Sequence, residues 1–328
     1  MMDSTDTQTE QPPLWELIPL ASYQLPSAPT ASNARRGLSS LKRLFRRQPQ
    51  EPQGPVKSED ELHRLEPERL DSVAGPLDWR EAAGVLQTAL EQRESGDRAW
   101  FIISPPAADY AGLLETWAAQ QDAICISAPA YDVVAGDYQG WLAELPQGEC
   151  SWTLPRLEHC WLRHPAGLDL VRDLFERLLS DKLDFGLIGC DSWAWAYLRF
   201  VVPTQAVRAL TFQAFDGQRL ARWLSALAAV DDHHPRRFRH AQSGNLVLAV
   251  NEEADTGVSS ELRYLAAQTR GNPTAALQAW RSRLRSEPDE PAAADEDTDA
   301  QRDVETIWVA PAVDFELPSG LDEPEALI

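Results

Sequence analysis

The chain has no long apolar run and no paired cysteines. None of its apolar stretches approaches the ~18 uninterrupted residues that a membrane-spanning helix needs, so we expect no transmembrane segment. The N-terminus carries no charged-then-apolar secretory pattern. The cysteines form no Cys-x-x-Cys pair, which favours reduced thiols over a disulfide scaffold; they are Cys125, Cys150, Cys160 and Cys190. These absences predict a cytoplasmic protein.

Basic residues are also scarce. The chain has 30 Lys and Arg against 51 Asp and Glu, a net charge of −21. The imbalance is concentrated in residues 286–328, where fourteen acidic residues against the single base Arg302 give −13 and leave −8 for the rest. Nucleic-acid binding requires a concentrated positive face, so no nucleic-acid partner is expected.

Signatures of common catalytic sites are missing as well. We find no Gly-x-Ser-x-Gly, His-Glu-x-x-His or glycine-rich dinucleotide motif. Cys160 and His164 stand at the helical spacing i, i+4, but zinc needs further ligands and a Cys–His nucleophile needs an orienting group. Because neither can be named, we assign no catalytic residue and no metal.

From Pro76 onward, apolar runs alternate with helix-like periodicity. Runs of strand type occupy residues 99–104, 122–129, 150–158, 185–191 and 209–215. Between them lie helix-like stretches, which predicts an α/β domain over 76–215: a five-stranded parallel sheet with helices on both faces. Residues 216–285 are interpreted as a helical lid subdomain, in which 245–250 suits strand or helix, and 286–328 as an acidic linker or tail.

Residues 1–75 are rich in Gln, Pro, Ser and Thr, a composition that predicts disorder. Two islands interrupt it. Residues 14–20 (LWELIPL) suit either a docking peptide or a local apolar cluster. Residues 35–47 (RRGLSSLKRLFRR) combine leucines at helical spacing with a basic flank. This basic segment suits an anionic inner-membrane surface, a membrane protein or another protein partner, and a solvated linker is the alternative; its contact candidates are Arg35, Arg36, Lys42, Arg43, Arg46 and Arg47.

Residues 99–114 have the surroundings of a phosphate-binding loop without its chemistry. A working loop reads G-x-x-x-x-G-K-[ST], in which backbone N–H groups and the lysine hold phosphates and the hydroxyl holds Mg²⁺. Here Ser104 and Asp109 take the glycine positions, Tyr110 the lysine position and Ala111 the hydroxyl position. Charge-assisted contacts of ~1.5–3 kcal/mol each are therefore missing. The degenerate loop comprises Ser104, Pro105, Pro106, Ala107, Ala108, Asp109, Tyr110 and Ala111.

Over about 95–285, this order of elements resembles the AAA-type and STAND-type P-loop ATPases. Their acidic second motif would fall at WTLPRLE, where Arg156 stands near the expected aspartate and Glu158 is the nearby carboxylate. Their polar sensor residue maps onto Asp191, for which helix N-capping is the alternative role. The segment TRGNPTAAL resembles the start of their lid helix, which implies that Gly271, Asn272 and Pro273 lie on the adenine side of a nucleotide.

The segments PRLEHCWLRHPAGLDLVRDLF and LIGCDSWAWAYL resemble a set of bacterial ATPase-like proteins in which a working P-loop is not dependable. The resemblance implies a non-hydrolysing regulatory or scaffolding protein that acts through protein or membrane-surface contacts and needs no cofactor. The alternative is a switch that binds ATP at a non-standard site. Trp193, Trp195 and Tyr197 suit core packing or a partner surface.

Overall fold

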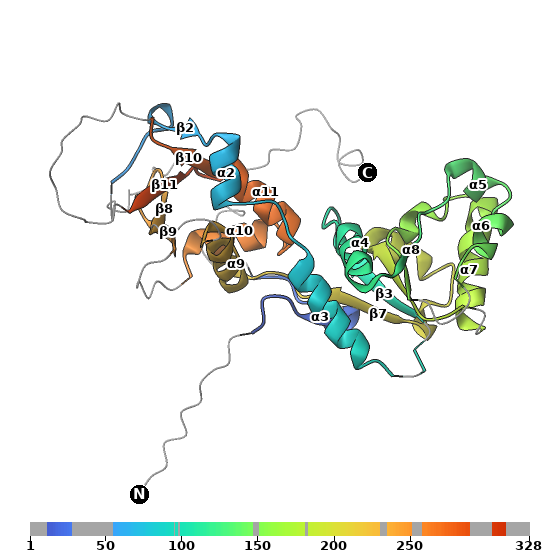
Figure 1. Cartoon of the computed structure of the whole chain (residues 1–328). Helices are drawn as coiled ribbons and strands as arrows, with labels where there is room; N and C mark the ends of the chain where they lie inside the picture. The colour runs from blue at the N-terminus through green and yellow to red at the C-terminus, as the bar shows by residue number, and fades with distance from the viewer. Residues whose placement is uncertain are drawn as a thin grey trace, which may run out of the picture. The chain divides into compact units, whose positions relative to one another are not determined.

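The computed structural model describes residues 12–27, 55–94, 96–97, 99–146, 151–180, 183–229, 235–250, 258–288 and 304–312. The chain divides into two compact units, and each is assembled from three separate stretches (Figure 1). Unit 1 comprises Met1–Ser27, Pro76–Arg219 and Ala266–Leu277. Unit 2 comprises Ala28–Gly75, Leu220–Leu265 and Gln278–Ile328.

Unit 1 is an α/β fold around a six-stranded sheet of order β1-β7-β3-β6-β5-β4. The strands are β1 (Leu17–Pro19), β3 (Ala99–Ser104), β4 (Ile124–Cys125), β5 (Trp152–Leu154), β6 (Gly186–Asp191) and β7 (Arg208–Phe212). Strands β3 to β7 lie at the five predicted positions and are parallel. The sheet is nevertheless mixed, because β1 joins its edge antiparallel to β7. A three-residue strand is too short to show the alternation that would have predicted it.

Helices cover both faces of this sheet, which explains why strand β3 is buried along nearly its whole length. On one face, Phe101 packs 5.2 Å from Phe175 and 5.1 Å from Trp195, between ring centroids. These two residues belong to α7 (Asp169–Leu179) and α8 (Ser192–Leu198). The other face carries α3 (Arg80–Glu91) and α4 (Tyr110–Gln121). The short helices α5 (Tyr131–Ala135) and α6 (Gln139–Ala143) complete the unit.

One position in this core, Gly189, must be glycine because neighbouring atoms approach its backbone closely. A Cβ atom on Gly189 of β6 would lie 2.2 Å from the carbonyl oxygen of Pro155 and 2.8 Å from Leu114 of α4. Only glycine permits such contact between β6, the end of β5 and the helix above them. The carboxyl ends of β5 and β6 are therefore held together where the sequence places its candidate residues.

Unit 2 contains a second sheet, of order β2-β10-β11-β8-β9. Its strands are β2 (His63–Arg64), β8 (Arg236–His240), β9 (Leu246–Val250), β10 (Leu284–Ser286) and β11 (Glu305–Val309). The unit also holds α2 (Pro67–Val73) and most of α9 (Gly217–Ala229), α10 (Ser260–Gln268) and α11 (Pro273–Arg283). The segment 216–285, predicted as a helical lid subdomain in which 245–250 suited strand or helix, thus contains strand β9 at that place and also the unforeseen strands β8 and β10. Strand β11 brings part of the predicted acidic tail into the same sheet.

Buried charged residues explain why these strands were not predicted from the sequence. Arg236 of β8 is buried and donates to Glu305 of β11 at 2.9 Å. Glu305 also pairs with Arg69 of α2 at 2.6 Å. Phe238 lies in the same strand, fully buried against Trp280 with a centroid distance of 5.4 Å. Charged residues at interior positions break the apolar alternation on which strand prediction depends, and a paired charge is tolerated inside.

The N-terminal region also differs from the prediction of disorder over 1–75. Residues 12–27 and 55–75 contribute β1, β2 and α2 to the two units. The local apolar island at 14–20 is ordered because Trp15 is only 3% exposed among the aromatic rings of unit 1. The composition of a segment indicates how much apolar surface the segment itself contributes. It does not indicate whether a distant part of the chain provides a surface on which the segment can pack.

Candidate functional site

The loop between β3 and α4, residues 105–109, bends through two left-handed positions. Ala107 has φ 58° and Asp109 has φ 53°. The Ala108 N–H donates to the carbonyl of Pro105 at 3.1 Å, which closes a turn between them. Glycine would adopt such φ values without steric cost, whereas alanine pays about 1–2 kcal/mol. The chain thus forms a tight strand-to-helix turn without glycine at either of these positions.

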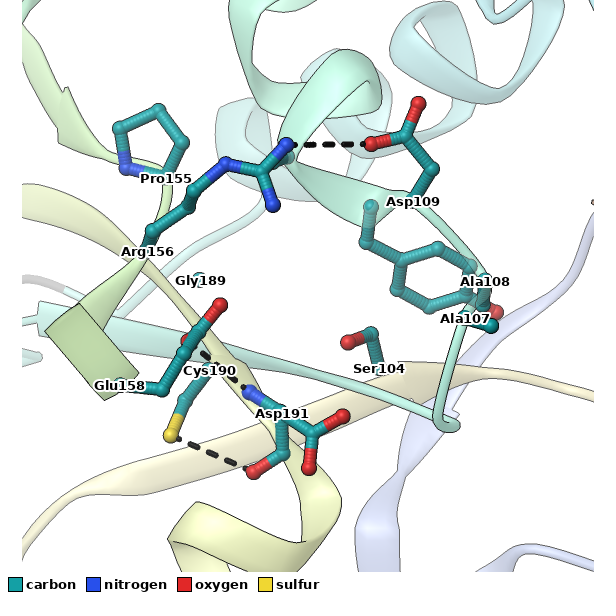
Figure 2. A pocket seen from close by; sticks show the side chains of 12 residues that line it. Ser104, Ala107, Ala108, Asp109, Pro155, Arg156, Glu158, Gly189, Cys190 and Asp191 are labelled. Atoms are coloured by element: carbon teal, nitrogen blue, oxygen red, sulfur yellow. Dashed lines mark hydrogen bonds and ion pairs between the residues drawn. The ribbon is translucent and has the colours of Figure 1, made fainter.

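A pocket of about 180 Å³ opens at this loop, at the carboxyl ends of the parallel strands (Figure 2). Open α/β sheets bind ligands at this edge. Ser104 and Asp191 are register partners at the ends of β3 and β6. The structure thus brings most of the degenerate loop together with both candidates from the second motif and sensor; the lining is Ser104, Ala107, Ala108, Asp109, Tyr110, Ala111, Pro155, Arg156, Glu158, Gly189, Cys190 and Asp191.

The charges of this pocket are mainly negative. Three carboxylates line it, on Asp109, Glu158 and Asp191, against one lining cation, Arg156. Figure 2 shows the Arg156 guanidinium and the Asp109 carboxylate pointing toward one another, with a nitrogen–oxygen distance of 3.3 Å. Both side chains are about half exposed, so the pair adds little stability. The pair directs the Arg156 guanidinium toward the Asp109 carboxylate of the loop.

Glu158 and Asp191 both bind backbone N–H groups. The Glu158 carboxylate accepts from the Asp191 N–H at 3.2 Å (Figure 2). The Asp191 carboxylate accepts from the Trp193 N–H at 2.7 Å, which caps the N-terminus of α8. The capping alternative for Asp191 is therefore the contact that the structure contains.

Tyr110, which the sequence analysis set against a phosphate-binding lysine, packs into the core. It is 3% exposed, and its ring lies 5.7 Å from that of Trp79 and 5.8 Å from that of Phe212. Burial raises the pKa of the Tyr110 phenol, so the side chain stays neutral. Position 110 supplies no cation to the pocket and contributes instead to packing beneath it.

The turn expected on the adenine side binds the loop itself. Asn272 donates its side-chain amide to the Pro106 carbonyl at 2.9 Å, and Thr274 donates its hydroxyl to the Ala108 carbonyl at 2.9 Å. Pro273 begins α11 directly after Asn272. Thr274 was not among the predicted site residues. Its place directly after Pro273, the first residue of a helix, could have indicated it.

Gly271 precedes this turn in a left-handed conformation, with φ +71°. A Cβ atom there would lie 2.6 Å from Ala214 and 2.8 Å from backbone atoms of Phe215. The Phe215 N–H donates to the Gly271 carbonyl at 2.9 Å. Glycine is thus required to seat the 270–274 turn against the segment that follows β7.

The thiols near the pocket are poor candidates for chemistry. Burial raises the pKa of the Cys160 thiol and of the Cys190 thiol, and the nearby Glu158 carboxylate adds to both shifts. A thiol that keeps its proton is neither a nucleophile nor a metal ligand. Within the described ranges, no three His, Cys, Asp or Glu side chains are grouped so as to hold a metal ion.

The aromatic residues of α8 divide between core and solvent. Trp195 is 4% exposed and belongs to the core, whereas Trp193 is 75% exposed. Tyr197 stacks on Trp161 at a centroid distance of 4.8 Å. Phe200, which the sequence analysis missed, follows α8 with 90% exposure. Its position seven residues after Trp193, two helical turns, was the available signal.

The six basic contact candidates, Arg35, Arg36, Lys42, Arg43, Arg46 and Arg47, lie outside the described residues. Across the part of the chain that the structure covers, no helix has both the length and the apolar character to cross a bilayer.

Comparison with known proteins gives little to set beside this geometry. No protein-family model matches the chain, and no curated protein matches it. Among solved structures, the chain is similar to the RuvB Holliday junction branch migration motor of Thermotoga maritima, with 16% identity and a TM-score of 0.36. The match covers 70% of this chain and 64% of that one. We base no conclusion on a similarity at this level.

Proposed function

We propose that unit 1 is a P-loop ATPase-like fold that has lost its phosphate-binding groups. The chain then acts as a non-hydrolysing regulatory or scaffolding protein through protein contacts. The observation that carries this proposal is the burial of Tyr110 between Trp79 and Phe212, at the position where a phosphate-binding lysine is needed. A buried neutral phenol leaves the loop without its principal cation.

The remaining groups of the pocket support the same proposal. Pro106 and Ala108 present their carbonyls to Asn272 and Thr274, and carbonyl oxygens do not bind phosphate. The Asp109 carboxylate stands at the start of α4, where a P-loop would receive an anion, and it would repel one. Ser104, Glu158 and Asp191 add no positive charge.

Calorimetric titration of the full chain with Mg·ATP and with Mg·ADP tests this proposal. We expect no saturable heat up to millimolar nucleotide and no rise in the thermal midpoint. A ligand present at 100 times its Kd would add about 2.7 kcal/mol to the free energy of unfolding. Saturable binding of either nucleotide would contradict the loss of the site.

A nucleotide switch with a non-standard site is the second candidate, favoured by Arg156. This guanidinium lines the pocket and is half exposed, so a phosphate would have to displace it from Asp109. In this case Asp109→Asn would raise ATP affinity and Arg156→Gln would abolish binding, both measured by the same titration. Equal affinities for the two variants would exclude Arg156 as the phosphate ligand.

Exposed apolar residues around α8 support protein contacts. Trp193 and Phe200 are largely solvent-exposed, and large exposed aromatics are frequent binding anchors. An apolar groove of about 360 Å³ adjoins the chain directly after Phe200; it is lined by Arg172, Phe175, Glu176, Leu179, Ser180, Val201, Val202 and Pro203. We call Trp193, Phe200 and this groove the α8 surface.

In-cell cross-linking followed by affinity capture tests the α8 surface. We expect Trp193→Ser combined with Phe200→Ser to remove proteins that the unchanged chain captures. Val56→Ser, at an exposed apolar position of unit 2, is the matched control and should capture the same set. Identical captured sets for all three chains would contradict a role for the α8 surface.

The basic segment 35–47 is proposed as a second contact, with a protein partner or with an anionic membrane surface. Its leucines and its six basic side chains suit a surface that is both apolar and negatively charged. Changing Lys42, Arg43, Arg46 and Arg47 to Glu should abolish co-sedimentation of the full chain with phosphatidylserine vesicles. Unchanged co-sedimentation would refute the membrane form of this contact.

A further inference from the structure

Residues 12–24 bind unit 1 in the manner of a separate peptide. Strand β1 adds to the edge of β7 in antiparallel register, with Leu17 opposite Phe212, Ile18 opposite Thr211 and Pro19 opposite Leu210. Addition of an extended segment to a sheet edge is a common mode of peptide recognition, in which the main chain gives affinity and side-chain pockets give specificity. Both kinds of contact are present here.

The side-chain pocket receives Trp15. Its ring lies 4.8 Å from that of Phe215, 5.5 Å from that of Trp79 and 5.8 Å from that of Phe212, between centroids. Only 3% of Trp15 is exposed. A buried tryptophan surrounded by three aromatic residues is a typical hot spot of a binding interface.

Polar contacts fix the direction of the segment on both sides of this tryptophan. The buried Arg219 donates to the Pro13 carbonyl at 3.1 Å and pairs with the Glu16 carboxylate. The Gln213 N–H donates to the Glu16 carbonyl at 2.9 Å. The Gln213 side chain also accepts from the Gln24 N–H at 3.2 Å and donates to the Gln24 carbonyl at 2.6 Å. The site therefore reads an extended segment with an aromatic residue followed directly by an acid.

The covalent connection from this segment to the next described residue is long. Residues 28–54 separate Ser27 from Pro55, and at ~3.3–3.6 Å per residue such a connection spans at most about 90–100 Å. A copy of the chain carries the same segment and can make every one of these contacts identically. Exchange of an identical element between copies replaces native contacts with the same contacts, so it is a low-cost route to association.

We propose that the β7 edge of unit 1, with its Trp15 pocket and Arg219, is a strand-accepting site through which two copies of this chain exchange residues 12–24. The site closes on its own segment in a single chain and on the partner's segment in an exchanged pair. This inference is independent of whether the pocket at residues 104–111 binds nucleotide.

Cysteine pairing between full-length chains tests the exchange. One chain carries Ile18→Cys and the other Thr211→Cys, both in a background in which Cys125 and Cys150 are serine. The two positions are register partners, and opposite residues of an antiparallel pair fall within the Cα separation that a disulfide needs. The chains are mixed at high concentration, unfolded in urea, refolded together and oxidised. We expect a covalent dimer on non-reducing electrophoresis that an excess of a synthetic peptide of residues 12–24 suppresses.

Two controls keep the test decisive. A single chain that carries both cysteines should close within itself, which checks the β1–β7 register. Adding Trp15→Ala to the Ile18→Cys chain should reduce the covalent dimer at least tenfold, and the same change in the peptide should remove its competition. Should Thr211→Cys fail to refold, judged by circular dichroism, Pro19→Cys with Leu210→Cys provides the neighbouring register pair.

Absence of the mixed dimer, while the doubly substituted chain closes within itself, would overturn the exchange. Failure of the doubly substituted chain to close would overturn the docking on which the exchange depends. Nucleotide titration does not enter either readout, so failure here is distinguishable from failure of the proposed loss of the phosphate site.

Discussion

Trp15 and Trp193 form a matched pair that measures how firmly the N-terminal segment is part of unit 1. Trp15 is 3% exposed and is surrounded by Trp79, Phe212 and Phe215, whereas Trp193 is 75% exposed on α8. Truncation of a buried tryptophan to alanine costs about 3–5 kcal/mol, since transfer and cavity terms add. Exposed substitutions usually stay within about 0.5 kcal/mol. We expect Trp15→Ala to destabilise unit 1 by ~3–5 kcal/mol and Trp193→Ala to leave it unchanged.

Thermal unfolding followed by near-ultraviolet circular dichroism measures the difference between the two variants. For a domain of 150–250 residues, each kcal/mol shifts the midpoint by about 2–4 °C. The Trp15→Ala midpoint should therefore fall by roughly 6–20 °C relative to the unchanged chain. Each variant loses one indole and has its own baseline signal, so the shift in midpoint is the informative quantity.

Equal midpoints for the two variants would refute this reasoning. Such a result would mean that Trp15 does not share the cooperative unfolding of unit 1, and that residues 12–24 detach before the sheet unfolds. A shift for Trp15→Ala below about 1 kcal/mol would lead to the same conclusion, since it falls short of the transfer term for so large a side chain.

Three further predictions concern the turn, the ion pair and the thiol. Gly271→Ala should lower the free energy of unfolding by at least about 1–2 kcal/mol, because Gly271 has a φ of +71°. Gly84→Ala, at a position in α3 with open space around it, should raise the free energy of unfolding by about 0.5–1 kcal/mol. Similar urea midpoints for the two variants would contradict this prediction. Asp109→Asn, which removes the charge at a left-handed position that asparagine tolerates, should change the free energy of unfolding by less than about 1 kcal/mol because the pair with Arg156 is half exposed; a larger loss in urea unfolding would contradict this. Burial raises the pKa of the Cys160 thiol, so above about pH 8.5 the unfolded chain loses this proton before the folded chain does, and the free energy of unfolding falls as pH rises. Cys160→Ala should therefore flatten the decline in stability between about pH 8.5 and 10. An unaltered slope would contradict this assignment of the decline to Cys160.

The strands of unit 1 that are buried on both faces were predictable from the sequence. Residues 99–104 and 185–191 are short continuous apolar runs, and the structure has strands over Ala99–Ser104 and Gly186–Asp191. The strands near the edge are shorter than their apolar runs suggest, with only Ile124–Cys125 and Trp152–Leu154 paired. Around β5 burial continues beyond the paired residues, whereas Ile124 of the edge strand β4 is 47% exposed, so an apolar run indicated the place of each strand but not its length or its burial.

The strands of unit 2 were not predictable in the same way. Strands β2 and β10 have two and three residues, and β11 lies within an acidic stretch. Their stability comes from one another across the sheet and from Glu305 bridging Arg69 and Arg236. Pairings between segments far apart in the sequence leave no local periodicity to detect.

The candidate site was predictable as a location but not as a set of contacts. The loop frame and the carboxyl ends of β5 and β6 indicated where Glu158 and Asp191 would approach Ser104. The pair between Asp109 and Arg156 was not foreseen, because Asp109 precedes α4 and Arg156 follows β5, two elements that lie far apart in the sequence. The bonds from Asn272 and Thr274 depend on the fold of a segment 166 residues away, which no local pattern contains.

The interleaving of the two units has a consequence for synthesis on the ribosome. Each unit is completed by a stretch close to the C-terminal end of the described chain, with residues 266–277 finishing unit 1. Asn272 follows Pro106 by 166 residues, which at ~5–20 residues per second are translated in roughly 10–30 s. Throughout that interval the loop between β3 and α4 lacks its hydrogen bonds from Asn272 and Thr274. Unit 1 is complete only after the first two stretches of unit 2 have been synthesised, and unit 2 is complete only after unit 1, so the two units form during overlapping intervals of synthesis.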